Sequence, residues 1–289
     1  MSDNPPILVI KGPLELRIVL VDIDELRHHE ELIPELLEEL AAEIERDGYL
    51  KHPVIVDEET MVVIDGSHRI EALKALGCRR VPACLVRYRD PRITVGCWYR
   101  TLRGPQGLRE LGRGLEEELG LRLEECGRVE PHEVGRPPTA LALTDGKTYL
   151  KVLAEFEHKE EAWGLVKRVE GFLTSRGFEV GFDTEEDALS KLSSGRVAMV
   201  LMTPRIEKDD VIRAARSGRV FPHKATRHVI PARPLFLNIP LEALRDTRPK
   251  EVVEEELKKR FSRKKIKRLP PGLLIEDRRY EEEVYVIEP

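Results

Sequence analysis

The stretch from Val62 to Arg69 constrains the fold of this chain more than any other. Val62–Ile64 is β-branched throughout and predicts a short buried strand. Asp65-Gly66 is a turn pair, and apolar residues then recur at helical spacing from Ile70 to Leu76 before Gly77, a common helix C-cap. The pattern predicts a strand, a tight turn and a helix whose start presents free N–H groups and a partial positive charge to an anion.

The turn residues themselves are chemically mixed. Asp65-Gly66-Ser67-His68-Arg69 supplies a carboxylate, a hydroxyl, an imidazole and a guanidinium within five residues, a mixture that suits a polyphosphate. An ordinary strand-to-helix turn, with Asp65 capping the helix and Arg69 in water, is an equal alternative, because short motifs often match by chance.

Length and charge bound the class of protein. A chain of 289 residues predicts about two domains, and a net charge of -5 gives no general attraction to nucleic acid or to an anionic membrane. One Gln and two Asn beside many Lys, Arg and Glu indicate a heat-adapted protein.

The N-terminus and the cysteines point to an ordinary soluble protein. The start of the chain does not resemble a signal peptide, and the longest apolar run, 197–202, is too short to span a membrane, so we expect a cytoplasmic protein. The four cysteines form no C-x-x-C pair, which argues against a zinc site; we expect small buried apolar residues.

Hydrophobic patterning predicts an α+β organisation in two parts. In the first part, an amphipathic helix begins at Pro34 and ends at Gly48. The other elements expected there are strands at 14–23, 54–56, 61–64, 81–86 and 93–98. After Arg103 we expect helices at 108–119, 160–175 and 207–216, a hairpin around Asp145-Gly146, and strands at 197–202, 235–237 and 283–287.

The basic run Lys258–Arg268 has two interpretations. It holds eight Lys and Arg among eleven residues and follows the acidic run Glu251–Glu256. One interpretation is a single exposed charged helix whose ends complement its dipole. The other is a nucleic-acid site.

A larger pattern resembles a known family. Its parts are Val21-Asp22, His29-Glu30, Pro34, His52-Pro53-Val54, the Ile64–Arg69 turn, Ala72–Cys78 and Val81-Pro82. This pattern is similar to the ParB/sulfiredoxin-like domain, and within it to the free L-serine kinases, whose C-terminal substrate segment is similar to residues 221–228. The resemblance implies a ParB/sulfiredoxin-like nucleotide-binding domain at 1–103 and a second α+β domain at 104–289, with the active site in the cleft between them.

The resemblance also implies an activity and its cofactors. Free serine kinases transfer a phosphoryl group from ADP, or from ATP in some members, to L-serine, giving O-phospho-L-serine that serves cysteine biosynthesis. We expect the ADP type, with Mg²⁺. No membrane partner is expected, and nucleic acid is not the expected ligand.

Residue roles follow from the same resemblance. Glu30 is the expected general base; from spacing alone, the cluster His28–Glu31 is a solvated helix start. Gly66, Ser67, His68 and Arg69 are expected to bind the nucleotide phosphates, with Asp65 orienting the turn or acting through Mg²⁺. His52 either shapes its loop or contacts the nucleotide. The residues expected at the serine and phosphoserine site are Trp98, Lys224, Thr226, Arg227 and His228.

The turn residues differ from those of two related families, and these differences bear on the alternative functions. Sulfiredoxins need a cysteine where Ser67 stands, so sulfinic-acid repair is not expected. ParB partition proteins carry a G-E-R-R-type turn and a following helix-turn-helix, whereas this chain has His68 and no evident helix-turn-helix. A ParB-like nucleotide-dependent DNA-binding protein is the alternative function that we keep.

Overall fold

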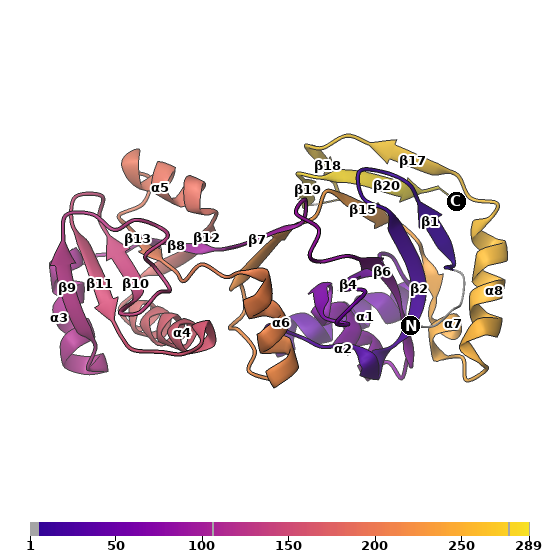
Figure 1. Cartoon of the computed structure of the whole chain (residues 1–289), viewed down its shortest axis with the longest axis horizontal. Coiled ribbons are helices and arrows are strands. Elements are labelled where there is room, and N and C mark those ends of the chain that lie inside the picture. Colours follow the sequence, from indigo (N-terminus) through magenta and orange to yellow (C-terminus); the bar gives the residue numbers. More distant parts are fainter. Residues whose placement is uncertain (1–5, 106, 277, 289) are drawn as a thin grey trace. The chain divides into compact units, whose positions relative to one another are not determined.

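The structure, a computed structural model, describes residues 6–105, 107–276 and 278–288 (Figure 1). The chain forms two compact units, Met1–Thr94 with His228–Pro289, and Val95–Arg227. These units differ from the ranges 1–103 and 104–289 expected from the sequence, because the chain returns to the first unit at His228. The N-terminal residues 1–5, which weighed against a signal peptide, lie outside the described part. Among the described residues no helix has the length and apolar character needed to cross a membrane.

The first unit is built on a mixed five-stranded sheet. Its strand order is β1 (Leu8–Ile10), β2 (Leu16–Asp22), β6 (Arg80–Val86), β4 (Val54–Asp57) and β5 (Val63–Asp65). Only the β4–β6 pair is parallel. Nearly every residue of β4 and β6 is buried, as expected for central strands that are covered on both faces. The sheet confirms the buried strand predicted before Asp65.

Two helices adjoin this sheet near the predicted turn. α1 (Pro34–Asp47) begins with Pro34 at its first position and ends at Gly48, whose φ of 75° is left-handed, so both predicted helix boundaries are confirmed. α2 (Ser67–Ala75) follows β5 and packs against α1. The short η1 (Ile23–Glu25) leads from β2 toward α1.

The end of the chain completes the first unit. Its elements are β3 (Tyr49–Leu50), β15 (Ala232–Leu235), β16 (Ile239–Pro240), α7 (Leu241–Arg245), α8 (Lys250–Phe261), β17 (Ile266–Leu269), β18 (Leu273–Ile275), β19 (Arg278–Tyr280) and β20 (Glu283–Ile287). The predicted final strand is confirmed as β20, which pairs in parallel with β15 and antiparallel with β17. A single helix through 258–268 is wrong, because α8 ends at Phe261 and 266–269 is a strand. The strand expected at 235–237 lies earlier, at 232–235.

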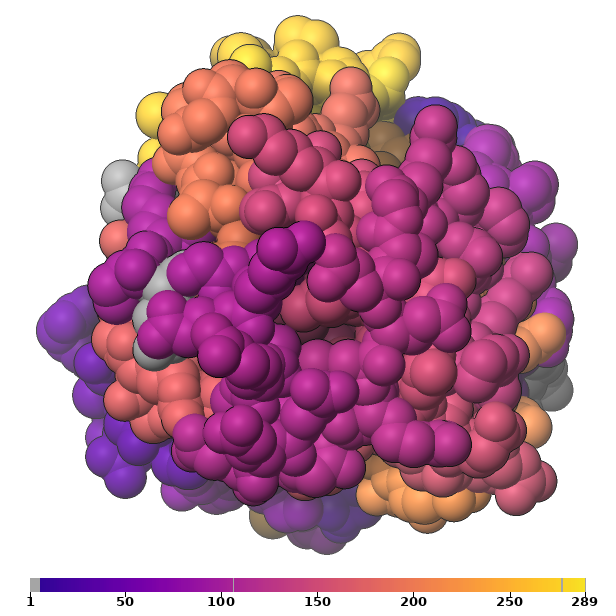
Figure 2. Space-filling view, turned by 90° about the vertical axis from the view of Figure 1, so that its left-hand side faces the viewer, coloured from indigo at the N-terminus to yellow at the C-terminus, as the bar shows by residue number. Residues whose placement is uncertain are grey.

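The second unit is a six-stranded antiparallel sheet with helices, which confirms the predicted α+β class. The strand order is β12 (Glu179–Asp183), β8 (Tyr99–Arg103), β13 (Met199–Met202), β10 (Thr139–Thr144), β11 (Tyr149–Leu153) and β9 (Arg122–Cys126). The helices are α3 (Leu108–Leu119), α4 (Lys159–Ser175), α5 (Glu185–Ser193) and α6 (Lys208–Ser217). β10 and β11 form the hairpin predicted at Asp145-Gly146. Figure 2 shows a face of this unit, on which the magenta segment around α3 and β9 is foremost.

Two further strands carry the chain from one unit to the other. They are β7 (Thr94–Cys97) and β14 (Thr226–Val229), which form a two-stranded sheet. Both crossings between the units fall within these strands, at 94–95 and at 227–228. The second unit is therefore one continuous segment inserted into the first.

Candidate functional site

The predicted strand–turn–helix is present at residues 63–75. β5 ends at Asp65, Gly66 has a φ of 106°, and α2 begins at Ser67. A Cβ on Gly66 would stand 2.7 Å from Val54 Cγ1 and 2.9 Å from Arg69 Nη2, so both the backbone conformation and the space require glycine. No side chain caps α2. The start of this helix can therefore offer backbone N–H groups to an anion.

Asp65 is held by two arginines. Its Oδ2 accepts hydrogen bonds from Arg69 Nη2 at 2.7 Å and from Arg233 Nη1 at 2.8 Å. Burial opposes ionisation of Asp65, but the charges of Arg233, Arg69 and Arg278 outweigh it and hold the pKa of that carboxyl well below its usual range. Asp65 is therefore ionised and held in place by the two arginines, with its side chain 29% exposed.

A role of Asp65 through magnesium stays a prediction. Both guanidinium groups bind Oδ2, so Mg²⁺ would have to use the other oxygen of this carboxylate. In the described part of the chain, no group of three or more His, Cys, Asp or Glu could hold a metal ion. The geometry supports the other role considered for Asp65, orientation of the turn.

Arg69 fastens the turn to the neighbouring loop. Its Nη1 donates to the carbonyl oxygens of Pro53, at 2.5 Å, and His52, at 3.2 Å. His52 Nδ1 in turn accepts a hydrogen bond from the Phe236 backbone N–H at 3.1 Å. Burial, with the charges of Arg69 and Lys51, lowers the pKa of His52 to about 4, so the ring is neutral at neutral pH. His52 does shape its loop; a contact with nucleotide stays a prediction.

A pocket of about 440 Å³ lies beside the turn in the first unit. His52, Asp65 and Arg69 line it together with Arg233 and Arg278. The remaining lining residues are Pro53, Ile55, Pro234, Leu235, Glu276 and Tyr280. A volume of this order falls within the range of small-molecule sites. Three of the predicted nucleotide residues thus share one pocket.

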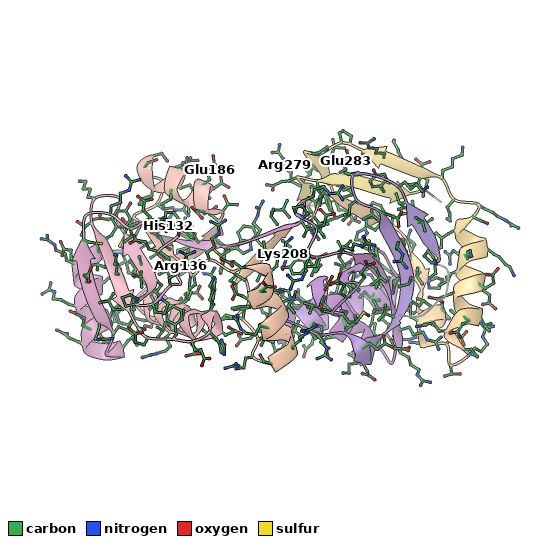
Figure 3. All side chains as sticks on the ribbon, in the orientation of Figure 1. His132, Arg136, Glu186, Lys208, Arg279 and Glu283 are labelled. Atoms are coloured by element: carbon green, nitrogen blue, oxygen red, sulfur yellow. The ribbon has the colours of Figure 1, made fainter. Side chains whose placement is uncertain are left out.

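Arg233 is one of the residues of this pocket that the sequence did not reveal. It is 5% exposed and also donates through Nε to Glu282, the residue before β20. Figure 3 labels Arg279 and Glu283, the chain neighbours of Arg278 and Glu282, on the C-terminal strands. Since Arg233 lies 168 residues from Asp65, no local pattern could have signalled the pair.

The segment that carries Glu30 is tied to α2 at two places. His28 Nε2 lies 3.0 Å from Glu71 Oε1, on the first turns of α2. The backbone N–H of Ile33 donates to His68 Nε2 at 3.1 Å. Glu30 is half-buried between these attachments. The structure therefore brings the segment 28–33 and the helix of the predicted turn together.

His228 lies against the same segment. The rings of His29 and His228 meet edge to face with centroids 5.3 Å apart, and His228 Nε2 is 2.7 Å from the hydroxyl of Tyr88. His29 is 4% exposed; its burial, and less strongly the charge of His28, lower its pKa to about 4, while a hydrogen bond with the Val63 backbone acts in the opposite direction. One predicted substrate residue is thus a neighbour of the residue next to Glu30.

The other predicted substrate residues gather around Trp98 in the second unit. Trp98 Nε1 donates to the carbonyl oxygen of Thr226 at 3.1 Å. Lys224 Nζ and Arg227 Cζ each lie 5.6 Å from the centroid of the indole ring, within cation–π range. Two cations therefore flank one half-buried indole, an arrangement that suits an anionic ligand with a small apolar part.

The fold and these residues define a class, an α+β protein with a ParB N-terminal domain. Residues 12–95 match the family model of that domain. The resemblance to the free L-serine kinases seen in the sequence is also confirmed, since similarity to proteins of that name extends over most of the chain.

Three similar proteins illustrate this. An ATP-dependent L-serine kinase of Staphylothermus marinus is 29% identical over 237 residues, which cover 78% of this chain and 91% of that protein. An ADP-dependent L-serine kinase of Thermococcus kodakarensis is 27% identical over 231 residues, covering 78% and 92%. A solved free serine kinase with a glutamate-to-alanine substitution, in complex with ADP, is 26% identical with a TM-score of 0.67, covering 84% and 97%.

Proposed function

We propose that this protein is a free L-serine kinase, which transfers a phosphoryl group from a nucleotide to the hydroxyl of L-serine and gives O-phospho-L-serine. ADP is the donor that we favour and ATP is the alternative, since relatives of both kinds are similar to this chain. The observation that carries the proposal is the attachment of the Glu30 segment to α2 through His28–Glu71 and Ile33–His68.

We assign the nucleotide to the first unit. Phosphate oxygens would accept hydrogen bonds from the backbone N–H groups of Gly66 to Arg69, where the uncapped start of α2 also contributes its positive dipole. His68 Nε2 is occupied as an acceptor from Ile33, so its donor toward phosphate would be Nδ1–H. Asp65 and the side chain of Arg69 hold the turn rigid. The adjoining pocket and His52 complete the proposed site.

Glu30 is the proposed general base. Phosphoryl transfer depends mainly on positioning and on charge stabilisation, and a carboxylate within hydrogen-bond reach of the serine hydroxyl can accept its proton late in the reaction. Two hydrogen bonds hold the segment of Glu30 on either side of it. That a glutamate was substituted in the solved relative bound to ADP is consistent with this role.

The proposed serine site consists of Trp98, Lys224, Thr226, Arg227 and His228. The cations beside the indole would bind the serine carboxylate and, after transfer, the phosphoserine group. His228 belongs to the first unit, where it is linked to Tyr88 and packed on His29, the residue next to Glu30. No protein residue here is assigned to magnesium, which we expect to arrive with the nucleotide phosphates.

The test is direct. The purified protein is incubated with L-serine, Mg²⁺ and either ADP or ATP, and the products are identified by mass spectrometry and ³¹P NMR. O-phosphoserine formed with AMP supports the ADP-dependent kinase, and O-phosphoserine formed with ADP supports the ATP-dependent one. Absence of O-phosphoserine with both donors refutes the proposal, and salt-dependent retention of DNA would then favour the ParB-like alternative.

A further inference from the structure

Arg100 is a fully buried arginine in the second unit, on β8. Its exposed fraction is 0%, although arginine is almost never fully buried unless it is paired. Neither its sequence position nor the resemblance assigned it a role. A buried charge is retained only where its surroundings compensate for lost hydration, so the groups around Arg100 show what it does.

Those groups include two backbone carbonyls, one carboxylate and two aromatic rings. Nη1 donates to the carbonyl oxygen of Trp98 at 2.6 Å and to that of Lys224 at 3.0 Å. Nε donates to Glu170 of α4. The guanidinium also lies 5.1 Å from the ring centroid of Trp163 and 4.7 Å from that of Phe182. One nitrogen of Arg100 thus joins two residues that we place at the serine site.

The carbonyl of Lys224 belongs to a backbone that needs such support. Lys224 has a φ of 59°, in the left-handed region that non-glycine residues seldom adopt and that costs on the order of 1 kcal/mol. The bond from Arg100 fixes this peptide and thereby fixes where the exposed side chain of Lys224 begins. The same nitrogen fixes Trp98, whose indole Lys224 faces.

We propose that Arg100 is a positioning residue, which holds Lys224 and Trp98 in the arrangement that binds the acceptor amino acid. The assignment to an amino-acid site rests on the proposed function. Arg100 itself does not touch the substrate; it acts through the two carbonyl groups. Lysine cannot replace it, because an ammonium group lacks the planar fork that serves Glu170 and the carbonyls at once.

The variants for the test are Arg100→Lys and the double variant R100Q/E170Q. Arg100→Lys keeps the charge beside Glu170. R100Q/E170Q also removes the charge of the Glu170 carboxylate, which the loss of Arg100 alone would leave unpaired. The matched control is Arg103→Gln, on the same strand but with a side chain that is 57% exposed. Circular dichroism melts verify folding of each variant.

The Arg100 variants are expected to bind serine more weakly and the nucleotide normally. The KM for L-serine rises about tenfold or more in Arg100→Lys and in R100Q/E170Q, whereas the Kd for a fluorescent ADP analogue changes less than twofold, because the phosphate turn lies in the other unit. Arg103→Gln leaves both constants unchanged. An unchanged KM for serine, or an equal loss of affinity for the nucleotide, overturns the proposal.

A second measurement does not depend on activity. Trypsin cleaves after Lys224, and Arg100 binds the carbonyl of that scissile peptide. Cleavage at Lys224 is expected to accelerate about tenfold in the Arg100 variants relative to other tryptic sites, and to stay unchanged in Arg103→Gln. An unchanged rate refutes the role of Arg100 even where the wild-type protein phosphorylates serine. Faster cleavage in a protein that does not phosphorylate serine refutes only the proposed function.

Discussion

At the scale of single residues, Glu30 and the histidines around it have different proposed roles. Glu30 is the proposed general base, and the histidines hold its segment in place. His28 and His68 make the two hydrogen bonds that hold its segment on α2, while His29 is buried against His228. Glu30 itself is half-buried. Substitution of the supporting histidines and substitution of Glu30 should therefore have different consequences.

The first prediction concerns Glu30→Gln. The amide keeps the size of the side chain but cannot accept the serine proton as a carboxylate does, so kcat should fall by about 10²- to 10⁴-fold. The Kd for the nucleotide, measured by calorimetry, should change less than twofold. Glu35→Gln, on the exposed first turn of α1, is the matched control and should keep wild-type kcat. Full activity of Glu30→Gln would exclude Glu30 as the general base.

The second prediction concerns pH and His29. Because its pKa is about 4 in the folded protein and about 6.5 in the unfolded chain, the unfolded state binds more protons between these values. The stabilisation from neutral His29 is complete above pH 6.5 and is lost as the pH falls toward 4, by about 3 kcal/mol at most.

The measurement is urea unfolding across that pH window. Wild type should lose stability as the pH falls, and His29→Gln should lose less, because one of the buried histidines no longer titrates. His52, whose pKa is also lowered to about 4, contributes in the same direction and remains in both proteins. His132→Gln, at an exposed position, should follow the wild-type curve. Equal slopes for wild type and His29→Gln would contradict the prediction.

The local sequence shows which residues of the turn carry chemically active groups, but not which distant residues bind them. Asp65, Gly66 and Arg69 are adjacent in the chain, so turn chemistry revealed them. Arg233 and Arg100 were missed, because each is defined by contacts across more than a hundred residues. The strand expected at 93–98 ended before Arg100, and the strand that carries it, β8, was seen only in the structure.

At the scale of elements, the turn between β5 and α2 is the most constrained part of the first unit. Gly66 has a φ of 106°, and a Cβ at this position would collide with Val54 and Arg69. Arg69 is hydrogen-bonded to the loop at His52-Pro53. The turn is thus fixed by its own glycine, by a neighbouring strand and by a loop. A rigid turn keeps the backbone donors at the start of α2 aligned before any ligand arrives.

The third prediction concerns Gly66→Ala. The left-handed conformation and the contact with Val54 should together destabilise the protein by about 1–3 kcal/mol, measured by urea unfolding. The Kd for the nucleotide should rise at least several-fold, because relief of the contact displaces the donors at the start of α2. Gly77→Ala is the control: it has a φ of 75° but no atom within 4 Å, so it carries the strain without the displacement. Nucleotide affinity should stay near wild type in Gly77→Ala.

Elements were predictable where the signals were local. α1 and α3 combine helical periodicity with a terminal glycine, and both were predicted at their observed boundaries. The helix predicted through 258–268 failed after Phe261, because Ile266–Leu269 pairs with β20, and charge composition carries no information about strand pairing. Long-range pairing decides such segments.

At the scale of the whole molecule, the second unit is an insertion. Residues 95–227 form a unit with its own sheet and helices, and the first unit is made of the segments on either side. The sequence showed two regions but not the return of the chain, since the final strands pair with elements that no local pattern links to them. The compact unit that contains the ParB N-terminal domain, residues 12–95, therefore also includes residues from the C-terminal part of the described chain.

The fourth prediction follows from this organisation. Residues 95–227 expressed alone should fold cooperatively, as judged by circular dichroism and a single thermal transition. The first unit, with 95–227 replaced by a short Gly-Ser linker between Thr94 and His228, should still bind ADP within about tenfold of the wild-type Kd. It should produce no phosphoserine, because Trp98, Lys224 and Arg227 have been removed. Turnover by the linked first unit would contradict our assignment of the serine site.

The pairing of β15 with β20 also sets an order of events during synthesis. Arg233 lies within β15, binds Asp65 together with Arg69, and is itself held by Glu282 just before β20. A nascent chain can therefore complete the 95–227 unit on the ribosome while Asp65 of the phosphate turn still lacks Arg233, one of the two arginines that bind it. Only when the last strand has emerged can the turn reach its final form, so translation that stops before residue 282 should yield a polypeptide without a competent nucleotide site.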